Sequence, residues 1–216
     1  MTPSSTESPA TRSTSTAARL RIGFSNVLLG VLFAIFAYVA FVNWQRTGQI
    51  QMLLLAFQEL LIVGLAITRN RSIEESRSAW DWGVALVGTG APLLQRQGIA
   101  LLGLAPIGLG LQIAGTILAT AAVISLGRSF GIVAANRGVR TTGFYRFVRH
   151  PLYGSYMVGY LGFLFGNVSV ANVLLILLTV ACQYTRAVSE ERILLHDPAY
   201  QAYVKQVRYR FIPYIF

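Results

Sequence analysis

The chain has 216 residues, of which 54% are apolar and 12% are charged, and its formal net charge is +10. Soluble domains usually carry about 25% charged residues, so this composition excludes an ordinary soluble domain. It predicts an all-α, polytopic membrane protein. The arginine excess then indicates cytoplasmic loops of a membrane protein, and we expect no nucleic-acid partner.

The single cysteine, Cys182, lies within an apolar run, so no intrachain disulfide can form. We expect a buried structural thiol there. No cluster of Cys and His has the spacing of metal ligands, and no Gly-rich phosphate loop follows a strand. The sequence therefore predicts neither a metal site nor a soluble Rossmann-type domain.

The N-terminal region begins with residues 1–19, which are rich in Ser, Thr and Pro and predict a disordered tail. The apolar run Ile22–Val42 is too long for the core of a signal peptide, so we expect a retained membrane helix. A second run covers Ile50–Ile67. Residues 20–126 are predicted to hold the N-terminal transmembrane helices.

The third and fourth runs are Trp80–Leu94 and Gly98–Leu126. The turn between them lies either at residues 95–97 or near Pro106. We favour residues 95–97, because Arg96 at the bilayer centre would cost roughly 2.5–3.5 kcal/mol.

The last two runs, Leu152–Phe165 and Val170–Tyr184, are short for membrane spans at about 15 residues each. Gly162 and Gly166 have the GxxxG spacing that lets helices approach closely. We expect a tightly packed or tilted pair, which brings the total to about six spans. Five spans plus a re-entrant segment is the alternative.

Six spans would leave only Arg46 and Arg96, of the 18 lysines and arginines, on the far side of the membrane. This asymmetry predicts that both termini are cytoplasmic. The membrane would be the inner membrane of a bacterium or the endoplasmic reticulum of a eukaryote. The segment Ala187–Tyr209 mixes apolar and charged residues, which predicts a helical segment on the cytoplasmic surface, broken around Asp197 and Pro198.

Two adjacent acids, Glu190 and Glu191, follow the last apolar run. Arg186 lies one helical turn before Glu190, so the two side chains can meet. They form either a surface ion pair worth well under about 1 kcal/mol or a site that binds an anion through Arg and a cation through Glu. Glu59, inside the second run, is a functional candidate too, unless it only bonds across helices or stays protonated.

A second polar group precedes the fifth run. Pro151 favours a helix start, which places Arg149 and His150 at a helix N-terminus, where free amides attract anions. Anchoring to lipid headgroups would explain these residue types but not their density.

At these residues the sequence resembles the isoprenylcysteine carboxyl methyltransferase family, and more widely the integral-membrane methyltransferases that include phospholipid methyltransferases. The resemblance runs from about Leu126 to the C-terminus. The matching elements are Gly143–Tyr145, Arg149–Tyr153, Glu190 with Glu191, Tyr200 with Tyr203, and Arg210–Pro213.

The resemblance implies a methyltransferase core over residues 127–216, with S-adenosylmethionine held between the loop before the fifth run and the C-terminal segment. Arg186 matches the family's arginine that faces the substrate carboxylate, and Arg186 and Arg149 are the candidate catalytic residues. The implied cofactor-binding residues are Arg137, Gly138, Val139, Arg140, Tyr145, His150, Pro151, Leu152, Tyr153, Glu190 and Glu191. The stretch 137–140 matches by position more than by residue type, and Asp197-Pro198 replaces the usual Phe-Gly.

The residue types fit this chemistry. Glu190 can bind the ammonium of the methyl donor, and an Arg or His can bind its carboxylate. Tyrosine rings can face its sulfonium or stack on its adenine. A carboxylate acceptor is already ionised and needs no general base, whereas an amine would need one, such as Glu191 or His150. The many arginines favour an anionic acceptor.

The predicted function is therefore carboxyl O-methylation of an isoprenylcysteine or a similar lipophilic carboxylate. A lipid amine of the phosphatidylethanolamine type or a lipophilic thiol is the alternative acceptor. A nicotinamide-dependent membrane sterol reductase and a non-catalytic scaffold or transporter are the alternatives outside methyl transfer. The expected partners are the bilayer and a lipophilic or prenylated-cysteine substrate, and the oligomeric state stays open.

Overall fold

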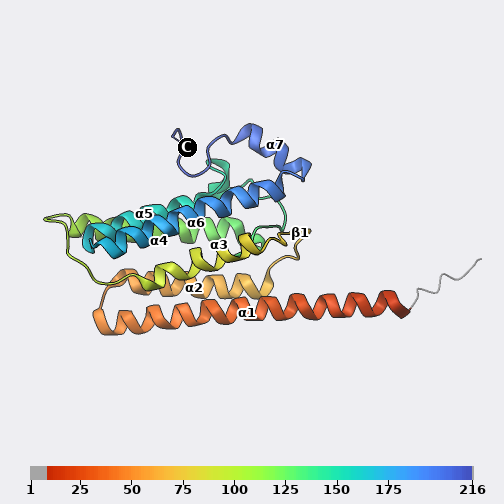
Figure 1. Cartoon of the computed structure of the whole chain (residues 1–216), viewed down its shortest axis with the longest axis horizontal. Coiled ribbons are helices and arrows are strands. Elements are labelled where there is room, and N and C mark those ends of the chain that lie inside the picture. The colour runs from red at the N-terminus through yellow and green to blue at the C-terminus, as the bar shows by residue number, and fades with distance from the viewer. Residues whose placement is uncertain (1–8, 216) are drawn as a thin grey trace, which may run out of the picture.

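The computed structural model describes residues 9–215, which form a helical bundle as predicted. Within this part of the chain, four helical segments are long and apolar enough to cross a membrane: Ser25–Thr47, Ile50–Thr68, Ala105–Ser129 and Val170–Leu194. Figure 1 shows the helices lying side by side along one direction.

Helices α1 (Pro9–Thr47) and α2 (Ile50–Thr68) form an antiparallel pair. The start of α1 corrects the expectation of a disordered tail over residues 1–19, because residues 9–19 are helical. Proline is tolerated in the first helical turn, and no further proline or glycine occurs before Gly23. Residues 1–8 lie outside the described part of the chain.

Helix α3 (Ala79–Gly90) continues into a short 3₁₀ turn, η1 (Ala91–Leu94), and α4 begins only at Ala105 (Ala105–Leu126). Arg96 therefore lies in a connection, as predicted. Residues 98–104, expected within the fourth helix, also belong to this connection. Pro106 explains the late start, since it occupies the first turn of α4.

The C-terminal half supplies the remaining elements. Its α-helices are α5 (Pro151–Gly166), α6 (Val170–Leu194) and α7 (Pro198–Gln206). The shorter elements are η2 (Gly127–Ser129), β2 (Ala135–Asn136), which pairs with β1 (Glu74–Glu75), and η3 (Gly143–Arg146).

Helix α6 runs to Leu194, ten residues beyond the predicted end at Tyr184. The charged residues after Tyr184 continue the same helix instead of starting a separate one. The predicted break at Asp197 is confirmed, because the Asp197 carboxylate accepts a hydrogen bond from Ala199 N (2.9 Å) and caps α7.

Glycines bring α4 and α5 into close contact. A Cβ on Gly162 would lie 2.5 Å from Gly108 O, and one on Gly115 would lie 2.7 Å from Gly159 N. Gly162 thus packs against α4 and not against α6, which differs from the predicted tight pair, and a Cβ on Gly166 would meet nothing within 4 Å. Small residues permit such close backbone approach between membrane helices.

The bundle has two different ends. The α1–α2 turn, the α3–α4 connection and the α5–α6 turn gather at one end (left in Figure 1), where Ile99 and Val168 form a backbone bridge. The β1–β2 pair and α7 lie at the other end, joined by a contact between His196 Nδ1 and Glu74 Oε2 (2.9 Å). Arg46 and Arg96 belong to the first end, and the site described below lies toward the second.

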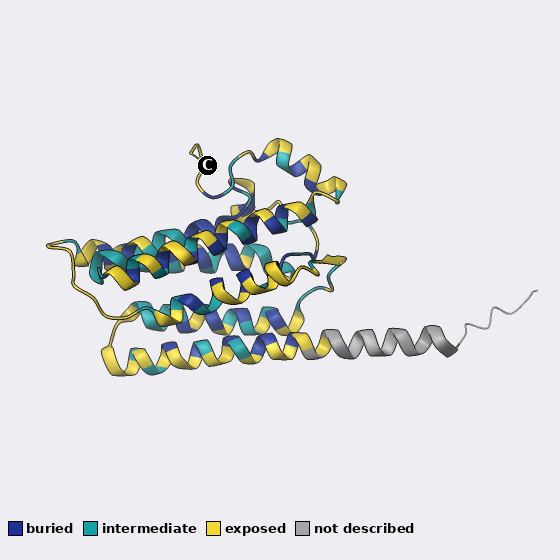
Figure 2. Ribbon diagram, viewed as in Figure 1, coloured by how far each residue is buried: buried dark blue, intermediate teal, exposed yellow. Residues whose placement is uncertain are grey.

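The outer faces of the helices are exposed and buried residues face the interior (Figure 2), and many of the exposed residues are large and apolar. Leu28, Phe57 and Leu177 are each about 60% exposed. Such contiguous apolar surface marks contact with lipid. A buried core of Phe33, Ile62, Val123 and other apolar residues joins α1, α2 and α4.

Candidate active site

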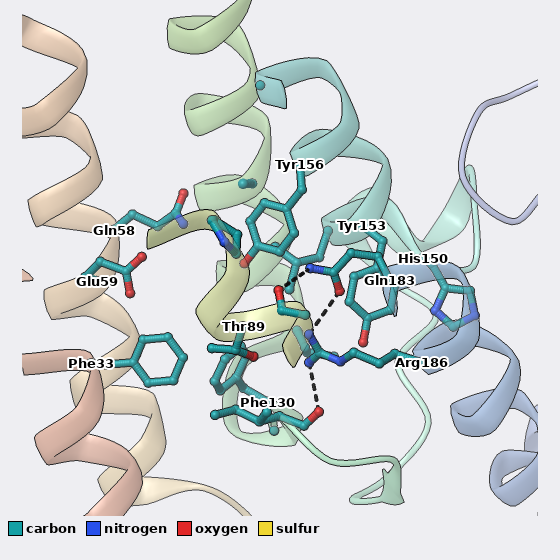
Figure 3. A pocket seen from close by; sticks show the side chains of 18 of the residues that line it. Phe33, Gln58, Glu59, Thr89, Phe130, His150, Tyr153, Tyr156, Gln183 and Arg186 are labelled. Atoms are coloured by element: carbon teal, nitrogen blue, oxygen red, sulfur yellow. Dashed lines mark hydrogen bonds between the residues drawn. The ribbon is translucent and has the colours of Figure 1, made fainter. Parts of the chain in front are cut away.

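One cavity of about 510 Å³ runs through the interior of the bundle, a volume typical of a small-molecule site. Its lining comes from α1 to α7 and from the segment between α4 and α5. Most charged lining residues belong to α6 or to the segment between α4 and α5, near β2 and η3, and we call this part the polar end. The lining residues from α1 to α4 are mostly apolar, with Glu59 as the charged residue among them, and we call this part the apolar end. Figure 3 shows part of the lining.

The polar end holds most of the residues that the sequence singled out. Of the predicted site residues, those that line the cavity are Arg137, Gly138, Val139, Arg140, Tyr145, Arg149, His150, Leu152, Tyr153, Arg186 and Glu190. Pro151 and Glu191 do not line it. Pro151 is the first residue of α5, as predicted, and its role there is to start the helix.

The loop after β2 is held by Asn136. Its side chain donates to Asp197 Oδ2 (3.0 Å) and accepts from Gly138 N (2.9 Å), and Gly138 adopts a φ of +98° that favours glycine. Arg137 is thereby buried, and its burial lowers the pKa of the guanidinium from the usual value. Its Nη2 lies 3.6 Å from Glu75 Oε1, and its Nε has no hydrogen-bond partner in the described part of the chain.

Glu190 faces the cavity from α6. Its Oε1 accepts a hydrogen bond from the Tyr153 hydroxyl (2.5 Å), and its Oε2 lies 3.7 Å from His150 Nδ1. The rings of His150 and Tyr153 stack with centroids 5.7 Å apart. Burial raises the pKa of Tyr145 well above its usual value, and the Glu190 charge adds to the effect, so this phenol stays neutral.

Glu191 points away from the cavity and contacts two arginines and one histidine. It accepts hydrogen bonds from Arg210 (2.9 Å at Nη2), lies 3.1 Å from His150 Nε2 and lies 3.2 Å from Arg149 Nε. The bond with Glu191 raises the pKa of Arg210. The structure thus places Glu191 behind the site, where it orients His150 and Arg149.

The C-terminal segment closes the polar end. Arg149 N donates to Tyr209 O (2.9 Å) and His150 N donates to Arg210 O (2.7 Å). A Cβ on Gly154 would lie 2.6 Å from Phe211 O, so only glycine allows this close contact. From α7, the Tyr203 hydroxyl donates to Tyr145 O (2.5 Å).

Arg186 lies between the two ends of the cavity. It donates to Gln183 Oε1 (2.9 Å) and Ile132 O (2.8 Å), and its guanidinium lies 5.2 Å from the centroid of the Tyr153 ring. The predicted pairing with Glu190 is not formed. Among the described residues no carboxylate forms an ion pair with Arg186, and its Nε has no hydrogen-bond partner.

The apolar end contains polar residues that the sequence motifs did not reveal. Aromatic and aliphatic side chains such as Phe33 and Leu55 form its wall, with Gln58 and Glu59 among them. Tyr156 and Gln183 face them from α5 and α6 (Figure 3). Only Glu59 gave a signal in the sequence, as an acid in an apolar run.

Residues 102–199 match the family described as phospholipid methyltransferase. This segment covers α4, α5, α6 and the loop that forms the polar end of the cavity. The matched residues make up a little under half of the chain, and the matched family is part of the integral-membrane methyltransferase superfamily, which includes the isoprenylcysteine carboxyl methyltransferases. The match supports a membrane methyltransferase, a class that implies a bilayer and a lipophilic substrate. No curated protein matches the sequence with significance.

Proposed function

We propose that the protein transfers a methyl group from S-adenosylmethionine to the carboxylate of a lipophilic acceptor, such as an isoprenylcysteine. One observation carries this proposal: a single cavity joins a polar end to an apolar end. Arg186 lies between them and forms no ion pair with a carboxylate of the described residues. A water-soluble cofactor and a membrane-dissolved acceptor can therefore meet in one enclosed space.

The polar end fits S-adenosylmethionine. Two buried groups there, the Arg137 Nε and the Tyr200 hydroxyl, have no hydrogen-bond partner among the described residues, and both belong to residues that line the cavity. Unpartnered polar groups are costly in a folded protein, so each favours a polar ligand. Glu190 adds a carboxylate and His150 an imidazole ring, and together with Arg137 they match an amino acid group.

Each residue then has a defined task. Glu190 would bind the ammonium, and Arg137 and His150 the carboxylate, through charge-assisted hydrogen bonds. Tyr145 and Tyr153 would face the cationic centre with their rings. The bound cofactor supplies an electrophilic methyl group.

Arg186 would bind and orient the acceptor carboxylate. Its guanidinium is fixed by Gln183 and by the Ile132 carbonyl, so it can hold an anion in one geometry. The acceptor is already ionised, and no residue has to remove a proton. Exclusion of water by the apolar wall favours a reaction in which opposite charges approach and cancel.

A lipid amine is the second candidate, because the matching family is described as phospholipid methyltransferase. An amine must lose a proton before or during transfer, so this acceptor requires a general base in the site. Purified protein in nanodiscs, with S-adenosylmethionine labelled in the methyl group, separates the candidates. We expect label on N-acetyl-S-farnesylcysteine as a base-labile methyl ester. Label on phosphatidylethanolamine alone would favour the amine and overturn the carboxylate.

We also propose that both termini face the cytoplasm, on the strength of the arginine asymmetry. In a Cys182→Ser background, Gln97→Cys in the α3–α4 connection should react with an impermeant maleimide added to intact bacterial cells. Arg71→Cys, in the loop at the other end, should react only after the cells are permeabilised. The reverse pattern would contradict this orientation.

A further inference from the structure

The apolar end of the cavity contains one carboxyl group that the proposed methyl transfer does not use. Glu59 lies at the middle of α2 and lines the cavity. It shares one helix face with four other lining residues, because their spacing follows the helical repeat: Gln51, Met52, Leu55 and Gln58. The side chain therefore belongs to the wall of the cavity and not to the lipid-facing surface.

This carboxyl group is buried and lacks a partner. Glu59 is only 9% exposed, and its Oε2 has no hydrogen-bond partner within the described part of the chain. The neighbouring Gln58 differs, since its Oε1 accepts a hydrogen bond from the Thr120 hydroxyl (3.2 Å). A buried polar atom without a partner is unfavourable unless a ligand satisfies it.

Glu59 and Arg186 lie on opposite sides of the same space. Figure 3 shows Glu59 on the α2 side and Arg186 on the α6 side, with Tyr156 reaching between them. Phe33 and Phe130, whose ring centroids are 5.6 Å apart, form an apolar boundary of this space. A molecule held there would contact a cation at one point and a carboxyl group at another.

From this arrangement we infer that Glu59 determines acceptor specificity by accepting a hydrogen bond from an N–H or O–H group of the acceptor. An ionised carboxyl group only accepts hydrogen bonds, and a protonated one still accepts at its carbonyl oxygen. A donor group on the ligand satisfies Glu59 in either state. The acceptor is thus an amphiphile with two polar groups, one methylated beside Arg186 and one held by Glu59.

This inference rests on the proposed function for the identity of the methylated group, but its test uses binding as well as turnover. The probes are N-acetyl-S-farnesylcysteine, which has an amide N–H, and S-farnesyl-3-mercaptopropionate, which has the same chain and carboxylate without it. Binding of each to full-length protein in detergent is measured by calorimetry without cofactor, and methyl transfer is measured separately. The variants are Glu59→Met, of similar shape, and Glu59→Gln, which keeps an accepting oxygen.

We expect Glu59→Met to weaken binding of the amide probe by about 10-fold or more and to leave binding of the second probe within about twofold. Glu59→Gln should retain most of the affinity for the amide probe. Leu60→Met, at the adjacent position on the exposed side of α2 and outside the cavity lining, is the control and should affect neither probe. Thermal unfolding of each variant shows whether it is folded.

Equal effects of Glu59→Met on both probes, or no effect on either, would overturn the inference. So would failure of the folded wild-type protein to bind the amide probe. If the probes bind as expected but S-adenosylmethionine does not, the proposed function fails while the acceptor site stands. If methyl transfer proceeds and does not depend on Glu59, the proposed function stands and the inference about Glu59 fails.

Discussion

Glu190 and Glu191 are neighbours in sequence but have different environments. Glu190 faces the cavity and is bonded by Tyr153, whereas Glu191 is enclosed by Arg210, Arg149 and His150. On a helix, adjacent residues point about 100° apart, so an acid pair at a helix end can serve a ligand and the fold at once. The sequence motif alone could not separate these roles.

Glu191→Gln is expected to destabilise the protein by about 3 kcal/mol, because it leaves buried cations without their counter-ion. The matched control is Glu74→Gln, whose partner His196 is exposed and whose loss should cost less than about 1 kcal/mol. Thermal unfolding in detergent measures both. Equal melting temperatures for the two variants would contradict the structural role of Glu191.

Arg186→Ala is expected to reduce kcat/KM for a carboxylate acceptor by about 100-fold, since a charge-assisted hydrogen bond is worth about 1.5–3 kcal/mol. Cofactor affinity should stay within about threefold, because Glu190, Arg137 and His150 remain. Initial rates and calorimetry give the two quantities. A loss of cofactor affinity as large as the loss of rate would place Arg186 in the cofactor site instead.

At the scale of elements, glycine contacts hold α4 and α5 in register behind the site. These contacts place Pro151 and His150, at the start of α5, beneath the C-terminal segment. Since backbone atoms face each other directly, an added methyl group has no space. The position of the polar residues therefore depends on glycines, which have no side chain to take part in the reaction.

Gly162→Ala should destabilise the protein by about 1–3 kcal/mol, because the new Cβ would lie 2.5 Å from Gly108 O. Gly159→Ala, one turn away on the same helix, is the control, since its Cβ would meet nothing within 4 Å. That change should be neutral or slightly stabilising through helix propensity. Unfolding midpoints that do not distinguish the two variants would refute the close α4–α5 contact.

The helices were predictable from sequence where long apolar runs define them, and their ends were not. The apolar run stops near Tyr184, but α6 continues to Leu194 because charged residues sustain a helix once it leaves the membrane. Similarly, α1 begins at Pro9 although its first residues are polar. Hydropathy reports the environment of a helix and not its length.

The candidate site was predictable from the sequence only where its residues stand in short motifs. Residues such as His150 and Glu190 stand in short motifs, and the structure places them side by side. The apolar end is built by helix faces that meet only in three dimensions, such as the Gln58–Glu59 face of α2 against α4. Neither spacing nor composition reveals which faces meet.

For the whole molecule, the central feature is the continuity of one cavity across the boundary between loops and membrane helices. Charged residues at the polar end come from the segment between α4 and α5 and from α6, and the other end is formed by the apolar bundle. This division explains how a protein with so few charged residues can keep a highly charged site.

The most direct test is calorimetric titration of S-adenosylmethionine into detergent-purified wild-type protein and into Glu190→Gln. We predict binding to the wild type and an affinity lower by about 10-fold or more in the variant, which loses the partner of the ammonium group. Both proteins should have the same unfolding midpoint within error. Absence of binding to folded wild-type protein, or equal affinity in the two proteins, would contradict the assignment of the polar end as the cofactor site.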